Sequence, residues 1–345
     1  MIDRRNFARL VSLAAVATAA APARTATTSR RAVIKPKRLS EGDTVGLVLP
    51  ASAAFEHEDI SLAREQLEAI GLRVIIAPHA YDRHGYFAGK DRDRADDINR
   101  MFANDEIDGI VCYTGGWGSP RILPYLDYDL IARKPKVFVG FSDITALLNV
   151  IHQRTGLVTF HGPVGGSNIE PYSLDNFRRV IMTAEAPGLL AAPQKKPSEL
   201  VDRSNRVIRL SPGKASGRLA GGNLTLVAAL MGTPYELDTD GAIVFLEDIR
   251  EEVYRIDRML TQLALGGKFE RMAALAFGRC TECRYSGPSF SLEDVLRDRF
   301  GALGKPAISG LSFGHIEQKM TIPVGVRGTV DAEAGTLSID EAAVV

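Results

Sequence analysis

Cysteine is scarce in this sequence, which has three among 345 residues. So few cysteines cannot build the disulfide framework that holds small secreted domains together. Cys280 and Cys283 form a C-x-x-C pair, but no second pair or suitably spaced histidines accompany it, which argues against zinc. We therefore expect no metal site and interpret the two cysteines as incidental thiols, although an oxidising compartment could join them as a disulfide.

The sequence also lacks a net charge and a nucleotide motif. Lys and Arg together number 42, as do Asp and Glu, so bulk charge favours no nucleic-acid partner. Neither the dinucleotide-binding pattern G-x-G-x-x-G nor the phosphate-binding pattern G-x-x-x-x-G-K-[ST] occurs. We therefore expect neither a nucleic-acid partner nor a cofactor.

The first 26 residues have the order of parts typical of an export signal. Arg4 and Arg5 resemble a twin-arginine motif, although Asp3 and Ala8 depart from it. An apolar segment, Leu10–Ala21, is about half as long as a membrane-spanning helix, and a small-x-small cleavage site follows it. The alternative is a disordered basic terminus with a chance Arg pair. We predict export to the periplasm or another extracytoplasmic space, a tether over 27–40, and a mature protein without stable membrane insertion.

Apolar runs of strand length alternate with helical patterns from residue 41 onward. This alternation predicts an open parallel sheet flanked by helices, of the flavodoxin or Rossmann type, over residues 41–183. A stretch rich in Pro, Lys and Ala, residues 184–204, is the expected linker to a smaller α/β domain over 205–345. The predicted strands are Thr44–Pro50, Arg73–Ala77, Ile107–Cys112, Lys136–Gly140, Ala242–Leu246, Lys305–Ile308, Met320–Val324 and Thr336–Ile339. A Gly-Gly-Asn turn is expected before the apolar helix that ends near Met231.

Ser142 stands where a predicted strand gives way to a predicted helix. Gly140 lies two residues before it, and the apolar spacing becomes helical from Ile144. This arrangement is typical of a nucleophile elbow, in which free backbone N–H groups stabilise an oxyanion. The alternative is an ordinary helix N-cap, a role that serine fills readily. On this stretch alone, the pattern favours the cap.

A glycine-rich loop, Tyr113–Ser119, follows another predicted strand at the same edge of the sheet. It is either a flexible turn before the next helix or a loop whose main-chain amides face a ligand. Other chemistry-bearing residues are ambiguous by themselves. Glu247 would ordinarily be a solvated strand end, and His315, in a glycine-flanked loop, is one of six histidines that spacing cannot rank.

Several separate motifs in the right order resemble the LD-carboxypeptidase family of serine peptidases, over about residues 40 to 340. They are Gly42–Pro50, Gly115–Ser119, Pro135–Thr145, Gly221–Leu224, Phe245–Asp248 and Gly314–His315 with Pro323–Gly325. The resemblance implies a catalytic triad in which Ser142 is the nucleophile, His315 the general base and Glu247 the acid that orients it. Because the acid and the histidine follow the linker, the active site is expected in the cleft between the two domains.

The resemblance implies a serine carboxypeptidase that removes the terminal D-alanine of murein tetrapeptides by cutting an L,D bond. The amides of Asp143 and of Gly115 or Gly116 are the expected oxyanion donors, and Arg121 is a candidate for binding the substrate carboxylate unless it forms a surface ion pair. The family also implies a homodimer. Two alternatives stay open: a self-immunity peptidase that cuts peptidyl-nucleotide antibiotics, and an exported binding protein without chemistry. The expected export distinguishes this protein from the best-known family members, which act in the cytoplasm.

Overall fold

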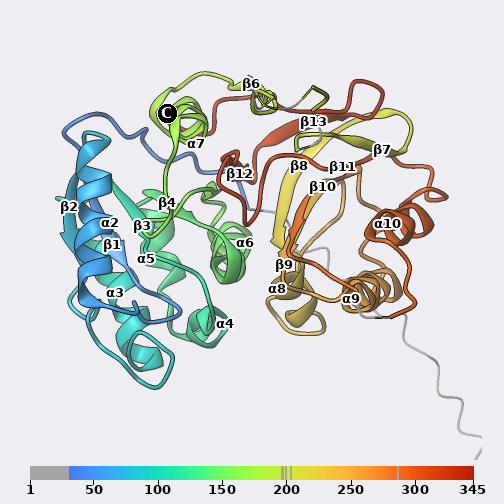
Figure 1. The fold of residues 1–345 in the computed structure, drawn as a ribbon. Coiled ribbons are helices and arrows are strands. Elements are labelled where there is room, and N and C mark those ends of the chain that lie inside the picture. Colours follow the sequence, from blue (N-terminus) through green and yellow to red (C-terminus); the bar gives the residue numbers. More distant parts are fainter. Residues whose placement is uncertain (1–30, 196–197, 199, 203, 286) are drawn as a thin grey trace, which may run out of the picture. The chain divides into compact units, whose positions relative to one another are not determined.

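A computed structural model describes residues 31–195, 198, 200–202, 204–285 and 287–345. The predicted signal segment and the first residues of the predicted tether lie outside these ranges. Within the described part of the chain, no helix is long and apolar enough to cross a membrane. The described residues build two sheets with helices packed on them (Figure 1).

The first sheet has six strands in the order β12-β5-β4-β3-β1-β2. Its strands are β1 (Thr44–Val48), β2 (Arg73–Ile76), β3 (Gly109–Cys112), β4 (Val137–Gly140), β5 (Thr159–His161) and β12 (Ile322–Val324). β1 to β5 pair in parallel, and β12 pairs with β5 in the antiparallel sense. β1, β3 and β4 are buried along their whole length, as continuous apolar runs predict for parallel strands. The predicted parallel sheet is therefore confirmed.

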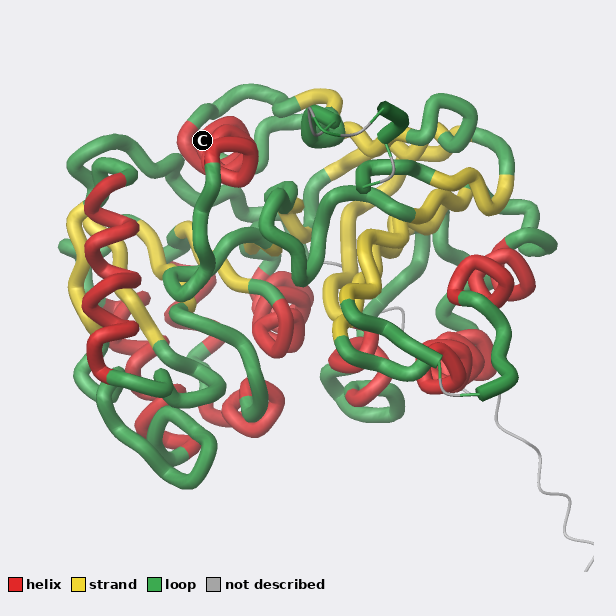
Figure 2. Tube along the Cα trace, in the orientation of Figure 1, coloured by secondary structure: helices red, strands yellow, loops and turns green. Residues whose placement is uncertain are grey.

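The helical segments of this half alternate with its strands (Figure 2). They are α2 (His57–Ala69), α3 (Asp91–Ala103), α4 (Ser119–Ile122), α5 (Tyr128–Arg133), α6 (Thr145–Thr155) and α7 (Pro171–Phe177), with short 3₁₀ turns Leu123–Tyr125 and Ser142–Ile144 and a π-helical turn Arg178–Met182. α3 buries Ala95, Ile98 and Phe102 on one face, as its spacing predicts.

The second sheet has eight strands in the order β6-β14-β13-β8-β9-β10-β11-β7. They are β6 (Gly188–Leu189), β7 (Ile208–Ser211), β8 (Lys214–Asn223), β9 (Ala242–Ile249), β10 (Ala274–Thr281), β11 (Ala307–Ser309), β13 (Arg327–Asp331) and β14 (Thr336–Ile339). Four adjacent strands, β8 to β11, pair in parallel. The associated helices are α8 (Leu224–Ala229), α9 (Val253–Leu265) and α10 (Leu292–Phe300).

α9 shows what holds the second half together. Val253, Ile256, Leu260 and Leu263 recur at helical spacing, and all four are buried in the cluster beneath the sheet. Burying one such side chain contributes about 1.5–3 kcal/mol to the free energy of folding. The helical spacing of these four residues predicts this apolar face, and the structure shows it.

Three segments differ from the sequence-based expectations. The Gly-Gly-Asn stretch is the end of β8 rather than a turn, because Gly221 and Gly222 continue the pairing with Phe245 and Leu246 of β9. β12 belongs to the first sheet, although it lies near the end of the chain. The described end of the expected tether is packed against the protein: Ile34 pairs with Leu157, and Leu39 is fully buried.

Candidate active site

Ser142 lies on a sharp turn between β4 and α6. Its φ angle is +62°, in the left-handed region that residues other than glycine rarely adopt. Gly140 allows the turn, because a Cβ there would lie 2.4 Å from Cγ2 of Ile144. The 3₁₀ turn that begins at Ser142 leads into α6 at Thr145. The N-cap positions of the turn and of the helix are Phe141 and Ile144, so Ser142 occupies neither. Of the two roles left open by the sequence, the geometry favours the elbow over the cap.

Three side chains, far apart in the sequence, form one hydrogen-bonded chain. The Nε2 atom of His315 lies 2.9 Å from the hydroxyl oxygen of Ser142. The Nδ1 atom of His315 lies 2.7 Å from Oε2 of Glu247. With the proton on Nδ1, His315 donates to the carboxylate and accepts from the serine. A serine, an imidazole and a carboxylate in this order can activate the hydroxyl for attack on a carbonyl.

Glu247 and His315 come from the second half of the chain. Glu247 is fully buried near the end of β9, and His315 lies in the loop after β11. The loop can approach Glu247 because residue 314 is glycine. Its φ is +110°, and a Cβ there would lie 2.7 Å from Oε2 of Glu247. The carboxylate is thus held by the sheet, while the imidazole reaches it from a tightly packed loop.

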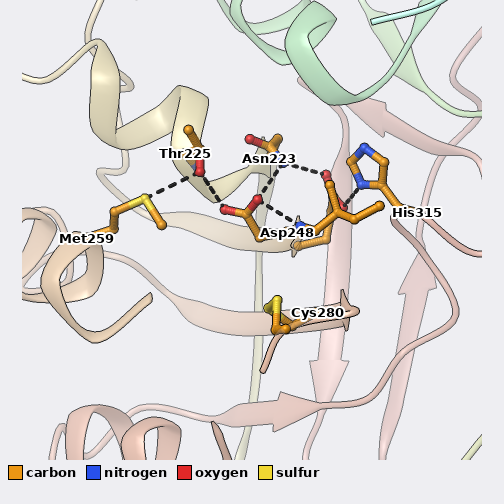
Figure 3. Close-up of a disulfide and its surroundings, with 9 residues drawn as sticks. Asn223, Thr225, Asp248, Met259, Cys280 and His315 are labelled. Carbon is orange, nitrogen blue, oxygen red and sulfur yellow. Dashed lines mark hydrogen bonds and ion pairs between the residues drawn. A yellow bond between two sulfur atoms is a disulfide. The ribbon is translucent and has the colours of Figure 1, made fainter. Parts of the chain in front are cut away.

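A second set of hydrogen bonds supports the buried carboxylate (Figure 3). The amide nitrogen of Asn223 donates to Oε1 of Glu247 at 3.3 Å and to Oδ1 of Asp248 at 3.1 Å. Asp248 also accepts from the backbone N–H and the hydroxyl of Thr225. Burial raises the pKa of Asp248 to about 6, while these hydrogen bonds act in the opposite direction. Asn223 therefore ties the acid of the triad to the start of α8.

Cys280 and Cys283 are joined by a disulfide at the end of β10. This corrects their interpretation as incidental thiols, because their Cα atoms are 5.5 Å apart, a separation that a disulfide spans. Cys280 is paired across the sheet with Asp248, so the disulfide lies beside the network that supports Glu247 (Figure 3). The third cysteine, Cys112, is free and buried.

His161 is a site residue that the sequence reasoning did not select. It ends β5, it is 2% exposed, and its Nε2 lies 4.0 Å from Oε1 of Glu247. Aromatic rings surround it, and neither of its ring nitrogens has a hydrogen-bond partner in the described structure. Burial lowers its pKa to about 4, against the opposing effect of Glu247. His161 is therefore neutral near pH 7 and forms no ion pair with Glu247. His315 is the histidine that contacts the Glu247 carboxylate directly.

The glycine loop touches the nucleophile. A Cβ on Gly115 would lie 2.7 Å from Cβ and 3.0 Å from Oγ of Ser142, and 2.9 Å from the amide nitrogen of Asp143. Gly116, with φ of +99°, lies against Ser52. In the described part of the chain, the Asp143 amide donates to no protein acceptor. These amides lie at the serine, and their part in stabilising an oxyanion remains a prediction.

Arg94 and Asp143 hold the glycine loop in place. Both side chains are buried. The guanidinium of Arg94 donates to the carbonyl oxygen of Gly118 at 3.1 Å and to Oδ1 of Asp91 at 2.6 Å. Oδ2 of Asp143 accepts from the backbone N–H of Ser119 at 2.7 Å. Burial raises the pKa of Asp143, and the hydrogen bonds from Ser119 oppose this effect.

Arg121 does not offer a free cation to a substrate. Its guanidinium forms two-pronged hydrogen bonds with the carboxylate of Asp91, at 2.7 to 3.1 Å, and lies over the ring of Phe87. This is the ion pair that the sequence analysis kept as the alternative. Trp117, two residues after Gly115, is 67% exposed and meets Tyr86 edge to face.

One group of described residues has the composition of a metal site. His79, Asp82 and Asp93 each offer a ligand atom, and these atoms all lie within 4.8 Å of one another. His79 and Asp93 are partly exposed and Asp82 is exposed. His79 Nδ1 is already 2.8 Å from the Asp82 carboxylate. None of the three belongs to the triad.

Comparisons with known proteins agree on the family. The model described as "LD-carboxypeptidase N-terminal domain" matches residues 45–162, and "LD-carboxypeptidase C-terminal domain" matches residues 216–330. The probable murein peptide carboxypeptidase of Bacillus subtilis is 38% identical over 89% of this chain and 94% of its own length. The murein tetrapeptide carboxypeptidase of Pseudomonas aeruginosa is 33% identical over 81% of this chain and 91% of its own.

Solved structures show the same fold. The muramoyltetrapeptide carboxypeptidase of Oxalobacter formigenes superposes with a TM-score of 0.74 and 29% identity, covering 87% of this chain and 99% of its own. The microcin C7 self-immunity protein, known from Escherichia coli, superposes with a TM-score of 0.82 and 25% identity, covering 90% of this chain and 100% of its own. Ser142 lies within the N-terminal family domain, and Glu247 and His315 lie within the C-terminal one. The chain therefore belongs to the LD-carboxypeptidase family and is a hydrolase of the peptide carboxypeptidase class.

Proposed function

We propose that this protein is a serine carboxypeptidase that cleaves the L,D bond before the terminal D-alanine of murein tetrapeptides. The observation that carries the proposal is the hydrogen-bonded chain Ser142–His315–Glu247. A serine in the left-handed region, next to unpaired backbone donors, adds the geometry that acyl transfer needs. The names of the Bacillus, Pseudomonas and Oxalobacter relatives supply the substrate class.

The first half-reaction forms an acyl-enzyme. The hydroxyl oxygen of Ser142 attacks the carbonyl carbon of the terminal peptide bond while its proton passes to Nε2 of His315. The tetrahedral intermediate then collapses, the C–N bond breaks, and His315 protonates the departing amine of D-alanine. Glu247 keeps the imidazole in the required tautomer and stabilises the imidazolium, without becoming protonated itself.

The negative oxygen of the intermediate needs donors that are already in place. The Asp143 amide and an amide of Gly115 or Gly116 fill this role, since they lie at the serine on two loops that are tied together. One donor of this kind is worth about 2.7–4 kcal/mol of transition-state stabilisation in a serine peptidase. In the second half-reaction, His315 removes a proton from water, the water attacks the acyl-enzyme, and Ser142 recovers its proton.

The test is incubation of the purified protein with murein tetrapeptide, followed by measurement of free D-alanine and of the tripeptide product. We expect release from the tetrapeptide and poor activity on the pentapeptide, whose terminal bond is D,D. Equal rates on both peptides would contradict the specificity for an L,D bond while leaving the serine mechanism intact. Absence of D-alanine from the tetrapeptide would contradict the proposed substrate.

A self-immunity peptidase is the second candidate, and one observation favours it. The microcin C7 self-immunity protein superposes better than the Oxalobacter carboxypeptidase, with TM-scores of 0.82 and 0.74. Sequence identity favours the carboxypeptidases instead. The Bacillus and Pseudomonas murein peptide carboxypeptidases are 38% and 33% identical to this chain, and the self-immunity protein is 28% identical. We give more weight to sequence identity, because substrate contacts depend on side chains and both functions share the fold. Cleavage of a peptidyl-nucleotide, with none of tetrapeptide, would reverse this choice.

A binding protein without chemistry is disfavoured by the site itself. A binding site has no need for a serine, an imidazole and a buried carboxylate at 2.9 and 2.7 Å in catalytic order. Export through the twin-arginine route and assembly as a homodimer are further proposals. Export is supported by the Arg4-Arg5 segment and the apolar run after it, and the homodimer by the family resemblance.

A further inference from the structure

Lys319 is a buried lysine whose ammonium group has no protein counter-ion in the described structure. The residue is 8% exposed and lies in the loop that follows His315. Its Nζ stands over the ring of Phe141, 4.6 Å from the ring centroid, and the described residues provide it with no hydrogen bond or ion pair. Nζ is not fully enclosed and keeps contact with solvent.

The nearby carboxylates are engaged elsewhere. Glu247 accepts hydrogen bonds from His315 and Asn223. Glu170 caps α7, where its oxygens accept from the backbone N–H groups of Tyr172 and Ser173. Both acids influence Lys319 only through space. The positive charge is therefore not neutralised by a direct contact within the protein.

Burying a charge without a partner costs free energy, and for Lys319 this cost appears as a lowered pKa. Burial lowers the pKa of Lys319, with Glu247 and Glu170 opposing the shift. Replacing a buried lysine that has no structural partner with an apolar residue would cost the protein little stability. An anionic ligand removes the cost, because a desolvated ammonium forms a strong, charge-assisted hydrogen bond with a carboxylate.

Lys319 lies at the right place to meet one particular carboxylate. Phe141, whose ring it covers, directly precedes Ser142, and the same ring lies 4.9 Å from the ring of His315. In a peptide substrate, the free terminal carboxylate is one residue beyond the carbonyl that Ser142 attacks. One residue spans about 3.3–3.6 Å of extended chain. A cation next to the residue before the nucleophile is therefore within reach of that carboxylate.

We propose that Lys319 binds the free terminal carboxylate of the peptide and so makes the enzyme a carboxypeptidase. The inference rests on the proposed function for its choice of ligand, a peptide bound with its terminal carbonyl at Ser142. It assigns to Lys319 the role for which Arg121 was the sequence-based candidate. Arg121 is already bound to Asp91, whereas Lys319 has no such partner.

The decisive experiment compares two substrates, murein tetrapeptide with a free terminus and the same peptide with an amidated terminus. We expect the unmodified enzyme to prefer the free acid by about 10- to 100-fold in kcat/KM, as a charge-assisted hydrogen bond allows. Lys319→Met should reduce this preference to less than about threefold, mainly by raising KM for the free acid. Lys319→Arg, which keeps the charge, should retain part of the preference.

Arg121→Met is the matched control, because it removes the cation that the sequence proposed for the same role but that is paired with Asp91. It should keep the preference of the unmodified enzyme for the free acid. The inference fails if Lys319→Met lowers kcat/KM equally for both peptides, since that result describes a structural residue. It also fails if Arg121→Met, and not Lys319→Met, abolishes the preference.

A binding measurement separates this inference from the proposed function. In a Ser142→Ala background, calorimetry should show tighter binding of the free-acid tetrapeptide than of its amide, and Lys319→Met should remove the difference. If the unmodified enzyme cuts no tetrapeptide but this difference is found, the proposed function fails and the role of Lys319 stands. If the two peptides bind equally, or neither binds, the role of Lys319 is overturned.

Discussion

Ser119 and Asp143 are joined by two hydrogen bonds, and Ser119 is the donor in both. The backbone N–H of Ser119 donates to Oδ2 of Asp143, and the hydroxyl of Ser119 donates to the backbone oxygen of Asp143. This pair connects the end of the glycine loop to the turn that carries the nucleophile. It fixes the distance between the two sets of amides that we propose as the oxyanion site.

We predict that Asp143→Ala lowers kcat for tetrapeptide hydrolysis by about 10- to 100-fold, because misplaced donors forfeit part of their effect. KM should change little, since the change acts on the transition state. Asp143→Asn is the control, because its side-chain oxygen can still accept from Ser119, and it should lose clearly less. Steady-state kinetics on the three proteins tests this. Equal losses in both variants would contradict the role of the hydrogen bond.

Gly115→Ala should inactivate the enzyme with little effect on its fold. The added Cβ would lie 2.7 Å from Cβ of Ser142 and 2.9 Å from the Asp143 amide, so it displaces the nucleophile or the donor loop. We expect a loss in kcat of about 10²-fold or more. Thermal unfolding serves as the control and should show a much smaller effect. Retention of full activity would show that the loop does not approach the serine so closely.

The triad should behave as one unit. Ser142→Ala and His315→Ala should each lower kcat by about 10⁴-fold or more, and the double variant should be hardly worse than either single one. Glu247→Gln should retain more activity than the other two, since a poorly oriented imidazole still works. Single-turnover kinetics on folded variants measures these losses. Additive losses in the double variant would contradict a shared proton transfer.

His161 should make the protein less stable in acid. Its pKa is about 4 in the folded protein and about 6.5 in the unfolded chain. The unfolded state therefore binds a proton first, and stability falls as the pH drops below about 6.5 towards 4. The slope from one such group is at most about 1.4 kcal/mol per pH unit.

The matching measurement is urea unfolding of the unmodified protein and of His161→Phe between pH 4.5 and 7.5. The phenyl ring suits the aromatic surroundings, and neither ring nitrogen has a hydrogen bond to lose. The variant should lack this part of the pH dependence. Identical slopes in the two proteins would mean that His161 is not kept neutral by burial.

Replacement of Arg4 and Arg5 by lysines tests the proposed export. We expect the precursor to stay in the cytoplasm with its signal uncut, because the pair is read as a twin-arginine address. Cell fractionation and immunoblotting of both forms measure this. Appearance of the mature form outside the cytoplasm despite the change would contradict this route.

Local sequence patterns were sufficient for the elements that carry the site. The apolar run before Gly140 predicts β4 and the spacing after Ile144 predicts α6. The role of Ser142 between them was not fixed in this way, since the local pattern favoured an N-cap over the elbow. The predictions of β4 and α6 succeed because strand and helix periods, and the freedom of glycine, act over a few residues. The resemblance to the family motifs likewise predicts the three triad residues without any knowledge of their contacts.

Other relationships depended on the tertiary structure, because they join residues far apart in the chain. Ser142 and His315 are 173 residues apart, and Glu247 and His315 are 68 apart, so no local pattern shows that they meet. Strand β12 is short and apolar, and its sequence does not say which sheet it joins. Arg121 is paired with Asp91, whereas Lys319 has no carboxylate in direct contact within the described structure. The sequence could not show this difference, because the neighbours of each cation depend on how distant segments pack.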